Sequence, residues 1–311
     1  MEEFAKADSY YKTLLRRIQS LPTSTATSAI YRLLGAIPLE GIYHMRVMSL
    51  FGQICRLSSE HPLKRLAVRQ LAIRENNSGS WFSQLRTIAD RYEIDITSQL
   101  LYPWSKTSWK SHYKRVIQEA WETRLRKDCH EKSSLAYIIW DNKDWLVHGI
   151  WRACRGRPHF VEAAVTRARM LAGRYSCGSA PWRRGAGDIC PACSELEDLP
   201  HIIYGCPVFR HITSKLRDKL KSLFMRDNLP PPRSAQEWVS VILNGDRYTT
   251  DDYQVVALRS HETEGHTMAS QICHRIHTQR DLYINDVILN ERSSLTEQED
   301  MNETIPYEIL S

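Results

Sequence analysis

The sequence lacks the features of several large classes of protein. No apolar run in its 311 residues approaches the roughly 20 residues that cross a bilayer, so no membrane partner is expected. The polar, acidic start contains no apolar segment of the kind found in secretory signals, which predicts an intracellular protein, nuclear or cytoplasmic. In such a reducing compartment the eight cysteines are expected to be thiols or metal ligands rather than disulfides.

Common catalytic motifs are absent too. The chain has no Gly-x-x-x-x-Gly-Lys-Ser/Thr loop, no Gly-x-Gly-x-x-Gly, no Gly-x-Ser-x-Gly and no His-Glu-x-x-His. Hydrophobic residues make up 42% of the chain and charged residues 25%, which is typical of a folded globular protein. The sequence therefore predicts a folded protein that is not an enzyme.

Apolar residues recur at steps of three and four along most of the chain, which predicts a mainly α fold, a helical array. The longest amphipathic segment, residues 107–127, has Trp109, Tyr113 and Trp121 on one face and Ser108 as a candidate N-cap. Other helices are expected at residues 4–18, 28–34, 39–57, 63–73, 81–92, 158–172, 208–224 and 235–243. Residues 137–140 resemble a strand, and beyond about Arg280 a disordered, polar C-terminal tail is expected.

These segments divide the chain into four regions. They are a helical region (1–128), a connector (129–157), a basic helix with a cysteine-histidine module and following helices (158–245), and a helix with a polar, acidic tail (246–311). The tail carries five acids and one base from Arg292 onward, whereas the whole chain has a formal net charge of +6. The basic middle therefore suggests a surface for a polyanion.

Four residues follow the spacing C-x2-C-x7-H-x4-C: Cys190, Cys193, His201 and Cys206. Zinc prefers four sulfur and imidazole ligands in a tetrahedron, and a two-residue gap lets one tight turn bring two thiolates together. The four-residue gap places the last two ligands on adjacent turns of a short helix. Since the protein fills every ligand position, a structural Zn²⁺ is expected rather than a catalytic one. Flanking alternatives for a ligand are Cys177 and His211.

An arginine-rich stretch precedes this motif. Residues 151–184 contain eight arginines and one acid. Arginine binds phosphate through a fork of donors, and aromatic rings stack on unpaired bases. RNA or DNA, single-stranded or structured, is therefore expected to contact Arg167, Arg169, Arg174, Tyr175, Trp182, Arg183 and Arg184. A second basic and aromatic set, in residues 104–115, is expected to be a solvated helix face whose aromatic rings serve the core.

The order of these segments resembles the C-terminal region, after the polymerase domain, of the reverse transcriptase protein of LINE-type (non-LTR) retrotransposons. The resemblance covers about residues 15–245, and it is carried by segments 21–40, 109–128, 131–135 and 150–152 and by the Cys-Pro-x-Cys…His…Cys-Pro series. It implies that Cys190, Cys193, His201 and Cys206 bind zinc and that the arginines before them contact nucleic acid.

The chain also departs from that family. The polymerase of the family depends on a Tyr- or Phe-Ala-Asp-Asp signature, and the nearest string here, Tyr283-Ile284-Asn285-Asp286, lies on the wrong side of the cysteine-histidine motif. The endonuclease domain is missing as well. A non-enzymatic, zinc-containing nucleic-acid-binding fragment is therefore expected. The alternatives are a helical protein-interaction module with a purely structural zinc, or a functionless retrotransposon remnant.

Overall fold

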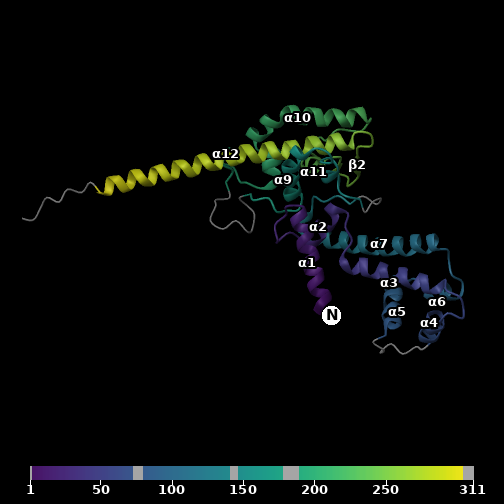
Figure 1. Cartoon of the computed structure of the whole chain (residues 1–311). Coiled ribbons are helices and arrows are strands. Elements are labelled where there is room, and N and C mark those ends of the chain that lie inside the picture. Colours follow the sequence, from purple (N-terminus) through teal and green to yellow (C-terminus); the bar gives the residue numbers. More distant parts are fainter. Residues whose placement is uncertain (1, 73–79, 141–145, 178–188, 304–311) are drawn as a thin grey trace, which may run out of the picture. The chain divides into compact units, whose positions relative to one another are not determined.

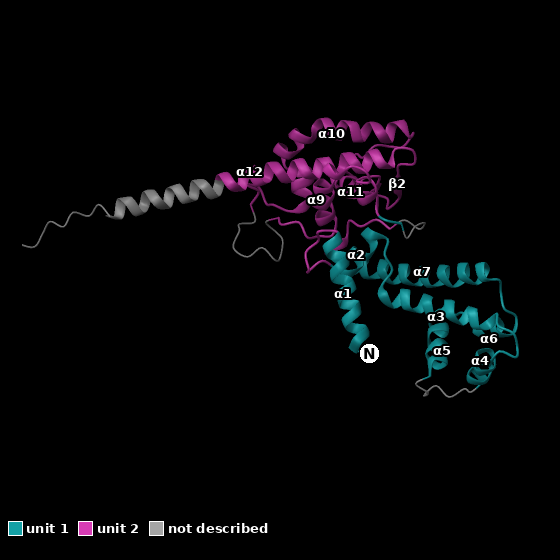
Figure 2. Ribbon diagram, viewed as in Figure 1, with its two compact units in different colours: residues 1–18, 26–133, 141–147 teal, residues 19–25, 134–140, 148–311 magenta. Residues whose placement is uncertain are grey.

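The computed structural model describes residues 2–72, 80–140, 146–177 and 189–303, with the backbone alone for residues 287–303. The fold is mainly helical, as the sequence predicts, and it divides into two compact units (Figure 2). Unit 1 comprises residues 1–18, 26–133 and 141–147, and unit 2 comprises residues 19–25, 134–140 and 148–311. Of the helices in the described ranges, none combines the length and the apolar character needed to cross a membrane.

Unit 1 is built from helices alone in the part that is described: α1 (Glu2–Ile18), α2 (Thr27–Leu34), α3 (Leu39–Cys55), α4 (Pro62–Ala72), α5 (Trp81–Arg91), α6 (Ile96–Leu101), α7 (Lys106–His130). Figure 1 shows α3 and α7 lying side by side, with α4, α5 and α6 near one end of α3. Every helix expected in this region is present. The short α6 was not expected, because six residues are too few to show a helical period.

The aromatic face of α7 forms much of the core of unit 1. Trp109, Tyr113 and Trp121 are buried, and the Trp109 indole donates a hydrogen bond of 2.8 Å to the Met48 carbonyl on α3. Gly52 makes this crossing possible, since a Cβ there would lie 2.1 Å from the Trp109 ring. The rings of the second basic and aromatic set thus serve the core, as expected, although Trp104 is exposed.

The N-terminus of α7 is capped one turn earlier than the sequence suggested. The Ser105 hydroxyl, not that of Ser108, accepts the capping hydrogen bond, and the donor is the Ser108 amide at 3.1 Å. Serine is favoured at the N-cap, so the sequence pattern alone does not distinguish Ser105 from Ser108 as the capping residue.

Unit 2 contains most of the remaining elements: η1 (Ser133–Leu135), α8 (Gly149–Arg152), η2 (Pro158–Phe160), α9 (Val161–Leu171), η3 (His201–Gly205), α10 (Pro207–Arg226), α11 (Ala235–Asn244), β1 (Arg247–Thr249), β2 (Val255–Ala257), α12 (Glu262–Glu303). The two strands form an antiparallel hairpin in which Tyr248 pairs with Val256. In the view of Figure 1, α12 runs between α10 on one side and α9 and α11 on the other.

One expectation for this unit is not met. Residues 137–140 form no strand; the Asn244 side chain donates to the Tyr137 carbonyl (2.8 Å) and accepts from the Ile139 amide (3.2 Å), so these backbone groups pair with a side chain rather than with a neighbouring strand. The side chains of α12 are described as far as Asp286, and only its backbone beyond that, in the region where the sequence predicts a disordered, polar tail.

Past α7, the chain passes from unit 1 to unit 2 after Ser133. The short segment 19–25 belongs to unit 2, which the sequence did not indicate. The reason is a pair of hydrogen bonds: Nε and Nη2 of Arg169 on α9 both donate to the Ser20 carbonyl, at 3.1 and 2.9 Å.

Candidate metal centre

A tight turn holds the first two cysteines of the predicted zinc motif. The Cys190 amide donates to the Glu195 carbonyl at 2.7 Å, and the Ser194 amide donates to the Cys190 carbonyl at 2.9 Å. Ile189 and Leu196 add an antiparallel bridge across the base of this turn. Ser194 takes the left-handed conformation (φ 63°) that lets the chain reverse after Cys193.

The second pair of residues lies at the two ends of η3, a single π-helical turn. The Cys206 amide donates to the His201 carbonyl at 2.7 Å, and the Asp198 carboxylate accepts from the His201 amide at 2.7 Å. His201 begins this turn and Cys206, with an extended backbone (φ −62°, ψ 119°), directly follows it, so the two do not lie on adjacent turns of a short helix as predicted. Cys206 is also the N-cap residue of α10, with Pro207 in its first turn.

The four predicted ligands come together. Their ligand atoms all lie within 4.8 Å of one another, and Sγ of Cys193 is 3.2 Å from Nε2 of His201. In a tetrahedron with zinc–sulfur bonds of about 2.3 Å, neighbouring ligand atoms are roughly 3.8 Å apart. The group can therefore hold a metal ion such as zinc with small adjustments. It is composed of Cys190, Cys193, His201 and Cys206, and does not include Cys177 or His211.

Two surrounding features suit this group to a metal. Nδ1 of His201 lies 3.5 Å from the Glu195 carboxylate, an arrangement that orients a zinc-binding imidazole and leaves Nε2 facing the thiols. Burial raises the pKa of the Cys190 thiol to about 12 and also raises the pKa of Cys206. A metal ion would have to displace these protons, as it does in other buried thiolate sites.

The loop between the two halves of the group is anchored by a buried ion pair. Glu197 is fully buried, and its carboxylate receives two hydrogen bonds from the Arg280 guanidinium on α12, at 2.9 and 2.6 Å. Such two-pronged pairs fix orientation as well as supplying energy. The pair therefore attaches the candidate metal loop to α12.

Replacing Glu197 with glutamine should detach this loop from α12 without removing a metal ligand. The variant leaves the buried Arg280 charge facing a neutral amide, and hydrogen bonds to charged groups contribute about 1.5–3 kcal/mol. We expect unit 2 to lose about 2–3 kcal/mol of stability, measured by urea unfolding, while zinc content stays at the wild-type value. Exposed Glu264→Gln on α12 is the matched control, and equal stability of both variants would contradict the anchoring role.

A second group of potential ligands, Asp246, Glu262 and His266, serves the fold instead. Arg167 donates to Nδ1 of His266 at 2.9 Å, and a guanidinium can only donate, so the imidazole proton sits on Nε2. Nε2 in turn faces Asp246 at 3.4 Å and Glu262 at 3.7 Å. Arg247 and Arg152 pair with the two carboxylates, one arginine to each. The ring nitrogens and carboxylates are thus satisfied by protein groups.

The structure corrects two of the predicted nucleic-acid contacts. Arg167 is fully buried, and its guanidinium donates to the Leu243 carbonyl, the His266 carbonyl and the Ser270 hydroxyl at 2.8–3.1 Å. Tyr175 is also buried, with its hydroxyl 3.2 Å from Nδ1 of His277. In this fold the Arg167 side chain cannot meet a phosphate or a base, and the buried Tyr175 ring cannot stack on a base. Three further predicted contacts lie outside the described residues: Trp182, Arg183 and Arg184.

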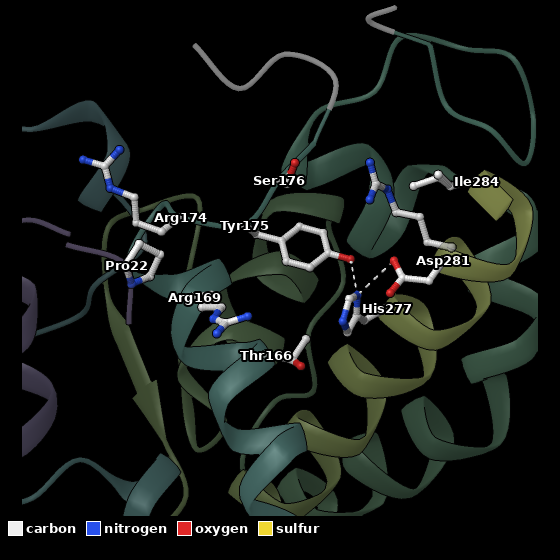
Figure 3. Close-up of a pocket in the computed structure, with 10 residues that line it drawn as sticks. Pro22, Thr166, Arg169, Arg174, Tyr175, Ser176, His277, Asp281 and Ile284 are labelled. Carbon is white, nitrogen blue, oxygen red and sulfur yellow. Dashed lines mark hydrogen bonds and ion pairs between the residues drawn. The ribbon is translucent and has the colours of Figure 1, made fainter. Parts of the chain in front are cut away.

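The remaining two predicted contacts, Arg169 and Arg174, line the rim of a pocket. Arg169 is exposed and Arg174 is half-buried, and Figure 3 shows both on the same side of the pocket as Pro22. Tyr175 lies deeper, with its hydroxyl directed toward His277. The pocket therefore gathers part of the predicted arginine set with residues of α12 that the sequence did not single out.

A basic surface on α10 was missed by the sequence reasoning. Its exposed positions carry six basic or imidazole side chains and one acid, Asp218. The six are Arg210, His211, Lys215, Lys219, Lys221 and Arg226. We call this set the α10 basic face. Its signal was present in the sequence, since the cationic residues occupy the positions between buried Phe209, Leu216, Leu220 and Phe224.

Comparison with known proteins adds no assignment. No protein-family model, no curated protein and no solved structure matches this chain. The likeness to retrotransposon reverse transcriptase proteins therefore rests only on the segments quoted above. Functional arguments have to start from the metal group and the charged surfaces of unit 2.

Proposed function

We propose that this chain is a non-enzymatic nucleic-acid-binding protein in which a zinc ion positions a basic helix. The observation that carries the proposal is the place of Cys206, which is both a member of the metal group and the N-cap of α10. The metal would thus fix the start of the helix that presents the α10 basic face. RNA or DNA is the proposed partner.

The donor set supports zinc in a structural role. Three thiols and one imidazole are soft and borderline ligands that suit zinc better than magnesium or calcium, which prefer oxygen. Four protein ligands complete a tetrahedron, so a bound ion would crosslink the loop rather than activate a water molecule. The π-turn η3, which connects two of the ligands, would be held at both ends.

The contacts of α10 support the second half of the proposal. Its inner side is fixed by buried residues and by Arg217, which donates to the Ile203 carbonyl of η3 and to the Thr213 hydroxyl. Lys215 and Lys219 are one helical turn apart on the solvent side, next to His211. A rigid row of cations can neutralise successive phosphates of a strand, which is the sequence-independent part of nucleic-acid binding.

The double substitution Lys215→Gln with Lys219→Gln tests this face. Each lost phosphate contact should lower the slope of log affinity against log salt by about 0.7 for a single strand, so the pair should lower it by about 1.4. At about 0.15 M salt we expect roughly tenfold weaker binding of a single-stranded RNA. Fluorescence anisotropy over a salt series measures both quantities, and a duplex DNA probe distinguishes the preferred nucleic acid.

The control variant loses the same number of positive charges, but from unit 1. Lys6→Gln with Lys127→Gln removes two exposed lysines of α1 and α7 in unit 1, and should leave both affinity and slope unchanged. Equal effects of the two double variants would mean that only net charge matters. Salt-insensitive binding to a protein partner would instead favour an interaction module with a structural zinc, and no binding at all would favour a functionless remnant.

The resemblance to LINE-type retrotransposon proteins extends the proposal to origin. A zinc-organised basic helix after a helical region is what the region behind the polymerase of such a protein would contribute. Because the chain has no Tyr- or Phe-Ala-Asp-Asp signature, we propose that it neither polymerises nor cuts nucleic acid. Its role would be to bind a strand of RNA or DNA.

A further inference from the structure

A pocket of about 310 Å³ lies in unit 2 between α9, the chain that follows it and α12 (Figure 3). Its floor is buried and consists of Thr166, Tyr175 and Arg280. Its rim includes the exposed side chains of Arg169 and Ser176. The volume is at the small end of the range of ligand sites and is large enough for one nucleotide-sized group.

The charges around this pocket favour an anion. Among the described residues that line the pocket, Arg169 and Arg174 are the cations at the rim, Asp281 is the one acid, and Arg280 is paired with Glu197. Arg169 uses two of its five N–H donors on the Ser20 carbonyl, so its guanidinium is held in place while other donors remain for a ligand. A positioned guanidinium of this kind matches the fork geometry of a phosphate.

His277 also lines this pocket. Its Nδ1 is occupied by the Tyr175 hydroxyl at 3.2 Å and the Asp281 carboxylate at 3.4 Å. Figure 3 shows these two interactions on one side of the ring and the other ring nitrogen on the side of Arg169 and Thr166. The Asp281 carboxylate, the one acid among the described residues that line the pocket, is thus turned toward Nδ1 of His277.

We propose that this pocket binds one phosphate group of a nucleic-acid strand, with Arg169 and Arg174 at the rim. The inference rests on the proposed function, but it adds a site separate from the α10 basic face. The phosphate is either an internal phosphodiester or a 5′-terminal phosphate. Both present the same oxygens to the arginines, and only the terminal one requires a strand end.

The test compares zinc-loaded full-length protein with two pocket variants. Arg169→Gln with Arg174→Gln removes both cations, and Ser176→Glu adds an opposing charge at the rim while keeping the contact between Arg169 and Ser20. The probes are two single-stranded RNAs of identical sequence, one with a 5′-phosphate and one without. We expect roughly fivefold to tenfold weaker binding by both variants, and a salt slope lower by about 0.7, because a single phosphate is lost.

The outcomes separate this inference from the proposed function. A loss with both probes assigns the pocket to an internal phosphodiester, and a loss with the phosphorylated probe alone assigns it to the strand end. Wild-type binding by both pocket variants, together with weakened binding by Lys215→Gln/Lys219→Gln, would overturn the pocket inference and leave the proposed function intact. If wild-type protein binds neither RNA, both fall.

Discussion

Cys206→Ser is expected to release the metal and unfold the loop around it while α10 remains helical. Serine is a good N-cap residue, so the substitution removes a ligand without disfavouring the N-cap position of α10. Structural zinc sites bind with about 10–16 kcal/mol, or about 2.5–4 kcal/mol for each of four ligands. This corresponds to an affinity loss of roughly a hundredfold to a thousandfold. Zinc content after dialysis against a weak chelator measures it.

Hydrogen exchange on the same samples locates the effect. Amides of the loop and of η3 should exchange rapidly in Cys206→Ser, whereas those of α7 in unit 1 should not change. Cys154→Ser is the matched control, because Cys154 lies in unit 2 outside the metal group and donates only to backbone carbonyls, which a hydroxyl can also do. A Cys206→Ser protein that retains one zinc per chain would disprove the ligand assignment.

Arg167→Met is expected to destabilise unit 2 by about 3–5 kcal/mol, the usual cost of removing one partner from a buried charged network. The variant leaves the Leu243 and His266 carbonyls and the His266 ring without their donor. Burial lowers the pKa of Arg167 to about 10, so the guanidinium still carries its charge at neutral pH. Urea unfolding measures this loss of stability, and hydrogen exchange of the α9 amides shows where it occurs.

The same variant decides between two roles for this arginine. Arg155 is an exposed arginine of the same unit, and Arg155→Met should change stability by no more than about 0.5 kcal/mol. If Arg167→Met were as stable as Arg155→Met but bound RNA more weakly, Arg167 would be a nucleic-acid contact, as the sequence predicts, and not a structural residue.

Local patterns were sufficient for most of the longer helices and for the metal group. Periodic apolar positions such as Trp109, Tyr113 and Trp121 predicted the buried face of α7, because a helix must place residues three and four apart on one side. The group containing Cys190 and Cys206 was predicted from spacing, since a turn and a short helical segment are enough to bring its halves together. Such features depend on neighbours in sequence.

Features that depend on distant partners could not be predicted. Arg167 carries the same charge as Arg169, yet Arg167 is buried against residues 76 to 103 positions away and Arg169 is exposed. The sequence offered no sign that the Glu197 carboxylate would form an ion pair with Arg280, which lies 83 positions further along the chain. The hairpin of β1 and β2 has three residues in each strand, too few to show the alternation on which strand prediction relies.

The ion pair between Glu197 and Arg280 also sets an order of events during synthesis. The metal loop is complete once residue 206 has left the ribosome, but its anchor, Arg280 on α12, is made only about 74 residues later (280 − 206). At about 5–20 residues per second this interval lasts roughly 4–15 s. During that time the nascent loop has no buried carboxylate contact to hold it, and the three thiols are exposed to oxidants. Early capture of a metal ion would therefore protect the nascent chain before the rest of unit 2 exists.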